Sequence, residues 1–147
     1  MPEIYFEDLS EGTLRELGSY TVQRDEMVQF ARQYDPQPIH TDDASAKESI
    51  FGGIIASGWY TAGICMRLLV KGFLNDTASM GARGLETLSW PRPVHPGDTL
   101  TVENEILETR PSEHRDDRGY IRNRTRGYNQ DGDEAISWTA TNVIARR

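Results

Sequence analysis

The sequence predicts an α+β chain with antiparallel strands and one long, enclosed helix, and three patterns indicate this class. Apolar residues at 100, 102 and 106 alternate with acids, as in a strand with one solvated face. The pair Asp131-Gly132 between two further strand-like runs is typical of a β-hairpin. Residues 58–73 carry an apolar stripe so wide that the helix must be covered by other elements.

The length and charge of the chain limit its organisation and its partners. A chain of 147 residues suits one domain, residues 1–147, that buries about 68 to 70% of its unfolded surface. A net charge of −7 and the absence of a long basic block argue against a nucleic-acid partner. Three arginines share one face of a predicted strand, which we interpret as a solvated outer face, with contact to coenzyme phosphates as the minor alternative: Arg122, Arg124 and Arg126.

Cysteine use and the N-terminal composition favour a cytoplasmic protein without a membrane partner. The single Cys65 excludes an intrachain disulfide, and its apolar helical setting predicts a buried thiol rather than a nucleophile. Residues 1–12 carry acids where a signal peptide needs bases, and no apolar run reaches membrane length.

The N-terminal quarter predicts an arm, a strand and a helix. Residues 14–22 form the first strand, with a bulge at Gly18. A helix face with apolar spacing then begins near Asp25 and ends at the prolines that follow Tyr34. Residues 1–12 are irregular, and three apolar side chains hold them to the body: Tyr5, Phe6 and Leu9.

Asp35 and His40 lie five residues apart on a stiff segment, where we look for the chemistry. Pro36 and Pro38 predict an extended or irregular course from Asp35 to His40 rather than a helix. Asp35 follows a helix C-terminus, where the macrodipole disfavours negative charge, so we expect a somewhat raised carboxyl pKa. Asp42 or Asp43 then caps a short polar helix.

The enclosed helix begins at Gly58 and ends near Phe73. Ser57 stands at the N-cap position, so the amides of Gly58 and its neighbours are unpaired donors at a positive helix end. A polar loop follows over residues 75–81. The remaining segments are residues 82–90, a turn at 91–98, a strand from Leu100, a charged connection at 111–119 with an exposed His114, and strands at 120–128 and 135–145.

Two stretches resemble the signature of the MaoC-like dehydratases, a family that includes the (R)-specific enoyl-CoA hydratases: residues 35–42 (DPQPIHTD) and residues 51–58 (FGGIIASG). Residues 92–100 (RPVHPGDTL) resemble a turn of the same fold. The resemblance covers most of the chain. It implies a hot-dog fold, in which an antiparallel sheet of about five strands wraps around a long central helix, and it implies pairing into a homodimer or higher homo-oligomer.

The resemblance also implies a reaction and its residues. Water adds to a 2-enoyl thioester, or leaves a 3-hydroxyacyl thioester, with His40 as base, Asp35 orienting the water and acting as acid, and the Gly58 amide binding the enolate oxygen. The substrate is an acyl-CoA or an acyl-carrier thioester, and no cofactor is expected beyond the coenzyme A that belongs to it. Four residues are expected to bind the substrate: Gln37, Ile55, Ser57 and Trp59.

Three departures from the family pattern leave alternatives open. The related hydratases usually have Asn at Gln37, His at Ser57 and Ser at the position of Met66 in the long helix, so rate or substrate shape is in question. The alternatives are a hot-dog acyl-CoA thioesterase and a non-catalytic acyl-binding subunit, the latter favoured by Ser57 and Met66. A metal site is not expected, because the three histidines are far apart in the sequence.

Overall fold

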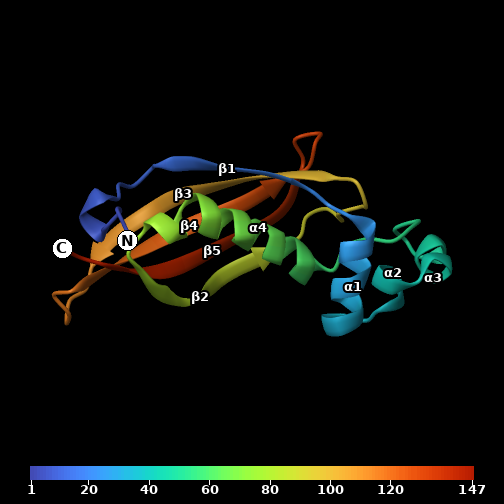
Figure 1. The fold of residues 1–147 in the computed structure, drawn as a ribbon, viewed down its shortest axis with the longest axis horizontal. Coiled ribbons are helices and arrows are strands. Elements are labelled where there is room, and N and C mark those ends of the chain that lie inside the picture. Colours follow the sequence, from blue (N-terminus) through green and yellow to red (C-terminus); the bar gives the residue numbers. More distant parts are fainter.

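One antiparallel sheet organises the computed structural model, which describes residues 1–147 (Figure 1). Its five strands follow the order β1-β3-β4-β5-β2. The sheet curves along a single long helix, α4 (Gly58–Gly72), so the predicted α+β arrangement of a sheet around a central helix is confirmed. The strands are β1 (Leu14–Thr21), β2 (Ser79–Ser89), β3 (Thr99–Pro111), β4 (Arg118–Tyr128) and β5 (Glu134–Ala145).

Three further helices gather beyond one end of the sheet, next to the N-terminus of α4 (Figure 1). They are α1 (Arg24–Tyr34), α2 (Pro38–Thr41) and α3 (Asp43–Glu48). Short 3-10 turns, η1 (Phe6–Asp8) and η2 (Leu74–Asp76), and both chain ends lie at the opposite end of the molecule. None of the helices combines the length and the apolar character that a membrane span requires.

Most element boundaries fall within two residues of the predicted ones, because local signals set them. Asp42 caps α3 by accepting a hydrogen bond from the Ser45 amide, and Ser57 caps α4. The predicted bulge in β1 is present: the pairing with β3 shifts between Glu16 and Gly18, and Gly18 has a φ of 101°. The arm is held as expected, with Leu9 buried and Phe6 packed against the core.

Two predicted segments differ from the structure. The stretch from Asp35 to His40 is extended only as far as Gln37, since Pro38 starts the short helix α2 that contains His40. Proline is well suited to the first position of a helix, where a missing amide hydrogen costs nothing. The predicted polar loop at 75–81 ends early, because Ser79 and Gly81 already pair with β5.

The core consists of two clusters that α4 connects. One lies between the second half of α4 and the sheet, and includes Cys65, Leu69 and Ile136. The other lies at the α1 end and joins Met27 of α1 and Ile64 of α4 to Leu100 of β3. Because α4 contributes to both clusters, its position relative to the sheet is fixed along its whole length.

Helix α4 packs closely on the sheet at Gly127 in β4. A Cβ atom at this position would lie 3.0 Å from both Cys65 Sγ and Ile136 Cγ2. The predicted buried thiol is confirmed, and burial raises the pKa of Cys65 to about 12. A thiol in that state is a core side chain rather than a nucleophile.

The three arginines of β4 lie on the outer face of the sheet, as expected. Each pairs with a glutamate of the same sheet. Arg122 pairs with Glu86 of β2, across β5, at 2.9 Å, while Arg124 pairs with Glu105 at 2.9 Å and Arg126 with Glu103 at 3.0 Å, both on the neighbouring β3. These partly exposed pairs satisfy the charges locally, and each is worth only about 0 to 1 kcal/mol.

We expect Gly127→Ala to lower the free energy of unfolding by about 1 to 3 kcal/mol, because the added methyl group must displace Cys65 or Ile136. Gly53→Ala is the matched control, since its methyl group meets no atom within 4 Å and its φ is not positive. Urea denaturation of both variants measures the effect. Equal stabilities would contradict the close packing of α4 on β4.

Candidate active site

Asp35 and His40 face each other at the α1 end of the molecule. Asp35 directly follows α1, whose helix ends there, and His40 sits in the short helix α2 that Pro38 begins. Their side chains meet with His40 Nε2 3.3 Å from Asp35 Oδ2. Two adjacent helix ends therefore place the two side chains together.

Both nitrogens of His40 have a defined environment. Nδ1 lies 2.8 Å from the carbonyl oxygen of Ile55, which can only accept, so Nδ1 carries the proton of the neutral ring. Nε2 is then the unprotonated nitrogen and faces Asp35. The side chain is only 6% exposed. His40 is thus oriented as a base whose free nitrogen points at the carboxylate.

Asp35 is held by two hydrogen-bond donors. Ser57 Oγ donates to Oδ2 at 2.7 Å, and Gln37 Nε2 donates to Oδ1 at 2.8 Å. Burial opposes ionisation and would raise the pKa of Asp35, but the hydrogen bonds from Gln37 and Ser57 outweigh it and lower the pKa, and the charge that His40 carries when protonated acts in the same direction. The raised pKa expected from the helix macrodipole is therefore wrong, because these donors act at much shorter range.

Ser57 connects this carboxylate to the start of α4. Its hydroxyl accepts a hydrogen bond from the Trp59 amide, which caps the helix, and donates to Asp35. The amide of Gly58, the residue after Ser57, donates to no group of the protein. A free amide at the N-terminus of a 15-residue helix is a preorganised donor for a negative oxygen.

Gly58 is required by close packing as well. Trp90 donates its indole Nε1 hydrogen to the Gly58 carbonyl at 3.0 Å. A Cβ atom on Gly58 would lie 2.4 Å from the indole ring. Any larger residue would have to displace Trp90, so glycine here allows the indole to pack directly against the start of the helix.

A cavity of about 440 Å³ opens beside the Asp35–His40 pair. The helix start at Gly58 and the turn before β3 form its walls, which are mainly apolar with a few polar groups, as is usual for small-molecule sites. Its lining residues are Asp35, Gln37, His40, Phe51, Ile55, Ala56, Gly58, Trp59, Thr61 and Trp90 to Val94.

The structure brings most of the predicted site residues together. Gln37, Ile55 and Trp59 line the cavity beside Asp35, His40 and Gly58. Ser57 does not line it, so its placement gives it a role behind Asp35 rather than the expected contact with substrate.

Met66 lies outside the cavity and is 42% exposed on α4. Met66 is eight positions after Gly58 in the helix, which corresponds to a rise of about 12 Å along the helix axis. The concern that its thioether replaces a hydroxyl next to the dyad is therefore not supported by the structure.

The sequence reasoning missed several cavity residues, most clearly Trp90 and Thr61. Trp90 packs edge-on against Trp59, with ring centroids 5.4 Å apart. In the sequence, Trp90 stands next to the proline-rich turn, and this position gives no indication that it packs against Trp59. Thr61 falls on the apolar stripe of α4 and carried no separate signal.

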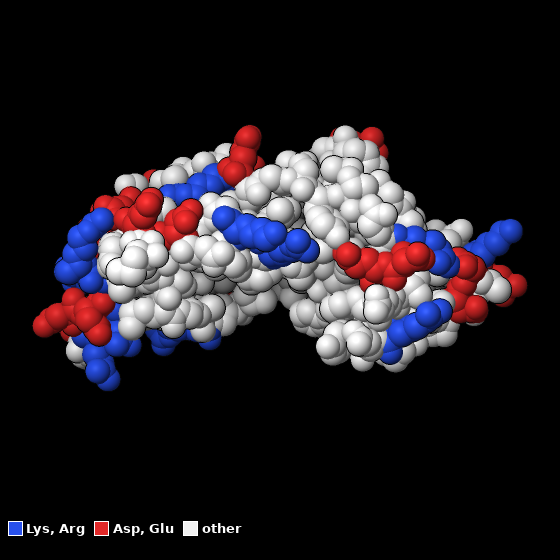
Figure 2. Space-filling model, viewed as in Figure 1, with Lys and Arg blue, Asp and Glu red and all other residues white.

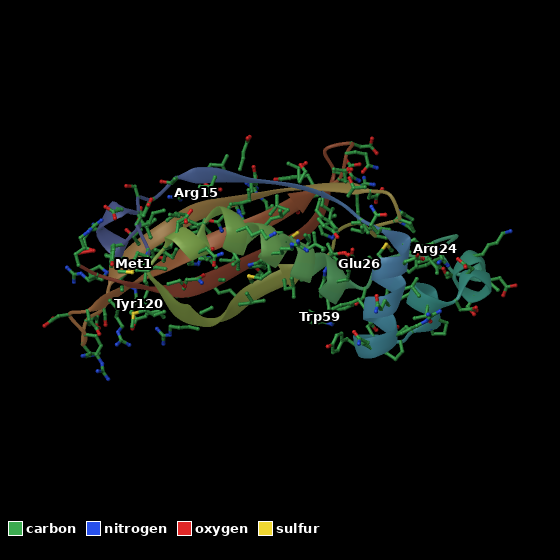
Figure 3. All side chains as sticks on the ribbon, in the orientation of Figure 1. Met1, Arg15, Arg24, Glu26, Trp59 and Tyr120 are labelled. Atoms are coloured by element: carbon green, nitrogen blue, oxygen red, sulfur yellow. The ribbon has the colours of Figure 1, made fainter.

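The carboxylate of Glu26 links α1 to α4 and to β1. Glu26 of α1 accepts hydrogen bonds from Tyr20 of β1 at 2.6 Å and from Tyr60 of α4. These two hydrogen bonds lower the pKa of Glu26 against the effect of burial. Figure 3 places Glu26 between α1 and the first turns of α4, with Trp59 close by. This link joins the helix that precedes Asp35 to the helix that carries Gly58.

No group of three or more His, Cys, Asp or Glu side chains is arranged to hold a metal ion. The functional groups of the cavity are one imidazole, one carboxylate, the guanidinium of Arg92, one free amide and a few neutral polar side chains. Such a set supports proton transfer and stabilisation of a negative oxygen.

A protein-family model and two curated proteins are similar in sequence to this chain. The family model described as MaoC like domain matches residues 8–126. Bacillus subtilis YdeM is 35% identical over 94 residues, covering 63% of this chain and 66%, just under two thirds, of that protein. The 3-hydroxybutyryl-CoA dehydratase of Methylorubrum extorquens is 34% identical over 119 residues, covering 78% of this chain and 73% of that protein.

Solved structures show the same fold over nearly the whole chain. The MaoC-like dehydratase from Rhodospirillum rubrum superposes with a TM-score of 0.91 at 41% identity, covering 99% of both chains. The (R)-hydratase PhaJ1 from Pseudomonas aeruginosa superposes with a TM-score of 0.77 at 27% identity, covering 98% of this chain and 86% of that one. Both likenesses include the sheet and the long helix.

We expect Ser57→Ala to raise the pKa of Asp35 and to cost about 0.5 to 2 kcal/mol of stability, because one hydroxyl both donates to the carboxylate and caps α4. A lowered pKa contributes stability above the unfolded value of about 3.9, and that stability is lost as pH falls through the folded value.

The acid-side loss of stability that Asp35 causes should therefore be smaller in Ser57→Ala and be complete at a higher pH, because the folded pKa lies closer to the unfolded one. Urea denaturation across pH and NMR titration of the carboxyl carbon measure both effects. Asp35→Asn is the control that removes the titrating group. An unchanged Asp35 pKa in Ser57→Ala would contradict the assigned hydrogen bond.

Proposed function

Because the chain belongs to the MaoC-like dehydratase family, we propose that it is a hydro-lyase that adds water to a 2-enoyl thioester or removes it from a 3-hydroxyacyl thioester. The carrier is coenzyme A or an acyl carrier protein. The observation that carries this proposal is the pair of Asp35 and His40 at 3.3 Å on a cavity that also contains the free amide of Gly58. The similarity to a 3-hydroxybutyryl-CoA dehydratase supports the same reaction class.

The chemistry begins with one water molecule on the cavity side of the dyad, within hydrogen-bonding reach of both the imidazole and the carboxylate. His40 Nε2, which is unprotonated because Nδ1 donates to Ile55, takes a proton from this water. Asp35, ionised by virtue of its lowered pKa, accepts a hydrogen bond from the same water and stabilises the imidazolium that forms. The water oxygen bonds to the β-carbon as the carbon–carbon π electrons move toward the thioester.

Negative charge then develops on the thioester oxygen and needs a donor. The Gly58 amide, at the positive end of α4, supplies it, and a preorganised donor of this kind is worth about 3 to 4 kcal/mol. The proton held by the dyad is returned to the α-carbon. Asp35 serves as the acid only after it has received this proton from His40, so the acid role does not require a carboxyl group that is protonated at rest.

The reverse sequence of the same steps eliminates water from a 3-hydroxyacyl thioester. The proposed chemistry uses proton transfers alone, so we propose no cofactor besides the coenzyme A that forms part of the substrate. The apolar part of the cavity wall, which includes Trp59 and Trp90, suits an acyl group.

We expect Asp35→Asn and His40→Ala each to reduce the rate of enoyl-CoA hydration at least about 100-fold, because each removes a proton-transfer group. A spectrophotometric screen over short, branched and medium-chain enoyl-CoAs measures the effect. His114→Ala is the matched control, since His114 is exposed in the connection between β3 and β4.

Near-wild-type turnover in both dyad variants would reject the proposal. Release of free thiol from a saturated acyl-CoA would instead indicate the thioesterase alternative. Binding of acyl-CoA without turnover of any enoyl-CoA would indicate a non-catalytic acyl-binding subunit.

The proposed assembly is a homodimer that covers β2 and the exposed side of α4. β2 is an edge strand with not one buried residue, so its outer backbone groups are free to pair. Exposed apolar side chains accompany it, among them Met66, Met80 and Leu85. Figure 2 shows charged side chains gathered mainly toward the two ends of this face, with few across its middle.

A second copy is the occupant that suits this surface best. An edge strand pairs readily with a twofold-related copy of itself, since the same backbone groups then satisfy each other. Trp59 and Trp90 line the cavity and are also exposed, so a partner on this side would enclose the acyl group as well.

We expect sedimentation at micromolar concentration to give roughly twice the chain mass of 16.6 kDa. Leu85→Glu should produce monomers, because it places a charge in the middle of the proposed β2 interface. Leu14→Glu is the control, as Leu14 is comparably exposed on β1 at the opposite edge of the sheet. A monomeric wild-type protein would contradict the dimer.

A further inference from the structure

Thr61 presents a hydroxyl group that the protein itself leaves unused. The residue is only 2% exposed, yet it lines the cavity. Its hydroxyl makes no hydrogen bond within the chain. In contrast, the hydroxyl of Thr77, a buried threonine beyond the end of α4, donates to the Phe73 carbonyl at 2.7 Å. Buried hydroxyl groups are normally paired, so an unpaired one on a cavity wall indicates a ligand.

The Thr61 oxygen is open to the cavity rather than sealed in the core. Four side-chain atoms of the protein are sealed from solvent and lack a partner: Arg15 Nη1, Asn104 Oδ1, Arg124 Nε and Arg146 Nε. The Thr61 hydroxyl is not among them, so its oxygen keeps some accessible surface, and the residue lines the cavity.

Helix geometry directs this hydroxyl toward the start of α4. Side chains of an α-helix tilt toward its N-terminus, and residues three apart share one face. Thr61 lies three residues after Gly58, so its side chain leans over the turn whose amide is free. Both residues border the same cavity, and Trp90 packs at the position where a side chain of Gly58 would lie.

We propose that the Thr61 hydroxyl donates a hydrogen bond to the thioester oxygen of the substrate, beside the Gly58 amide. The inference rests on the proposed hydratase site and adds a second donor to it. The hydroxyl strengthens its bond as charge builds on the oxygen, so it acts on the rate of the chemical step more than on substrate binding.

The test compares Thr61→Val, which has the same shape without the hydroxyl, with Thr61→Ser, which keeps it. Thr61→Val should reduce kcat for enoyl-CoA hydration about 10- to 100-fold with little change in KM, since one donor at such an oxygen commonly contributes a factor of this size or more. Thr61→Ser should stay within about threefold of the wild type.

Thr77→Val is the matched control, for which we expect the opposite result: a loss of stability without a loss of activity. It removes a hydroxyl that is hydrogen bonded within the protein, so it should lower stability and leave kcat unchanged. Thr61→Val should not lower the thermal midpoint, because it removes a buried hydroxyl without an intramolecular partner.

A second measurement does not need turnover. Butyryl-CoA labelled with ¹³C at its carbonyl is saturated and cannot be hydrated, and hydrogen bonds to the carbonyl lower its stretching frequency in the infrared spectrum. The frequency should be higher when the ligand is bound to Thr61→Val than to the wild type or Thr61→Ser.

The outcomes separate this inference from the proposed function. A wild type that hydrates no enoyl thioester but shows the Thr61-dependent infrared shift would reject the hydratase and retain the donor. An active wild type whose kcat and infrared frequency do not change in Thr61→Val would retain the hydratase and overturn the donor. Equal losses in Thr61→Val and Thr61→Ser would also overturn it, because the methyl packing rather than the hydroxyl would then matter.

Discussion

The hydrogen bond from Ser57 to Asp35 is the constraint on which the site depends. It joins the residue after α1 to the residue before α4, so the carboxylate, the facing imidazole and the free helix amide are positioned by one contact of 2.7 Å. The same hydroxyl caps α4. The geometry of the candidate site and the initiation of α4 therefore cannot vary independently, which keeps the site of a small domain rigid.

The two halves of the central helix α4 have different roles, one in the cavity and one in the core. Its first turn supplies Gly58 and Thr61 to the cavity and Tyr60 to the link with Glu26, while its second half packs on the sheet through residues such as Cys65 and Leu69. Packing of the second half holds the first turn in place. The site thus lies at the end of a rigid element, where helix amides are free and the dipole is positive.

Local patterns were sufficient to predict most of the fold. The helix start at Gly58 follows from the Ser57 cap, the strand bulge from Gly18, and the enclosure of α4 from its wide apolar stripe. Signals of this kind act within a few residues, so the sequence carries them fully. The residues expected to form the site, Asp35, His40 and Gly58, also lie within one stretch of the chain that two helix ends fold together.

The sequence by itself determined the class of fold, the helix that the sheet encloses, and the residue types available for acid–base chemistry. Only the tertiary structure decided the ionisation of Asp35, the inward-facing hydroxyl of Thr61, and the meeting of Trp90 with Gly58. Each of these depends on atoms brought from distant segments to within hydrogen-bonding or van der Waals distance. Interactions at that range override the weaker influence of helix dipole or local propensity, and they exist only once the chain has folded.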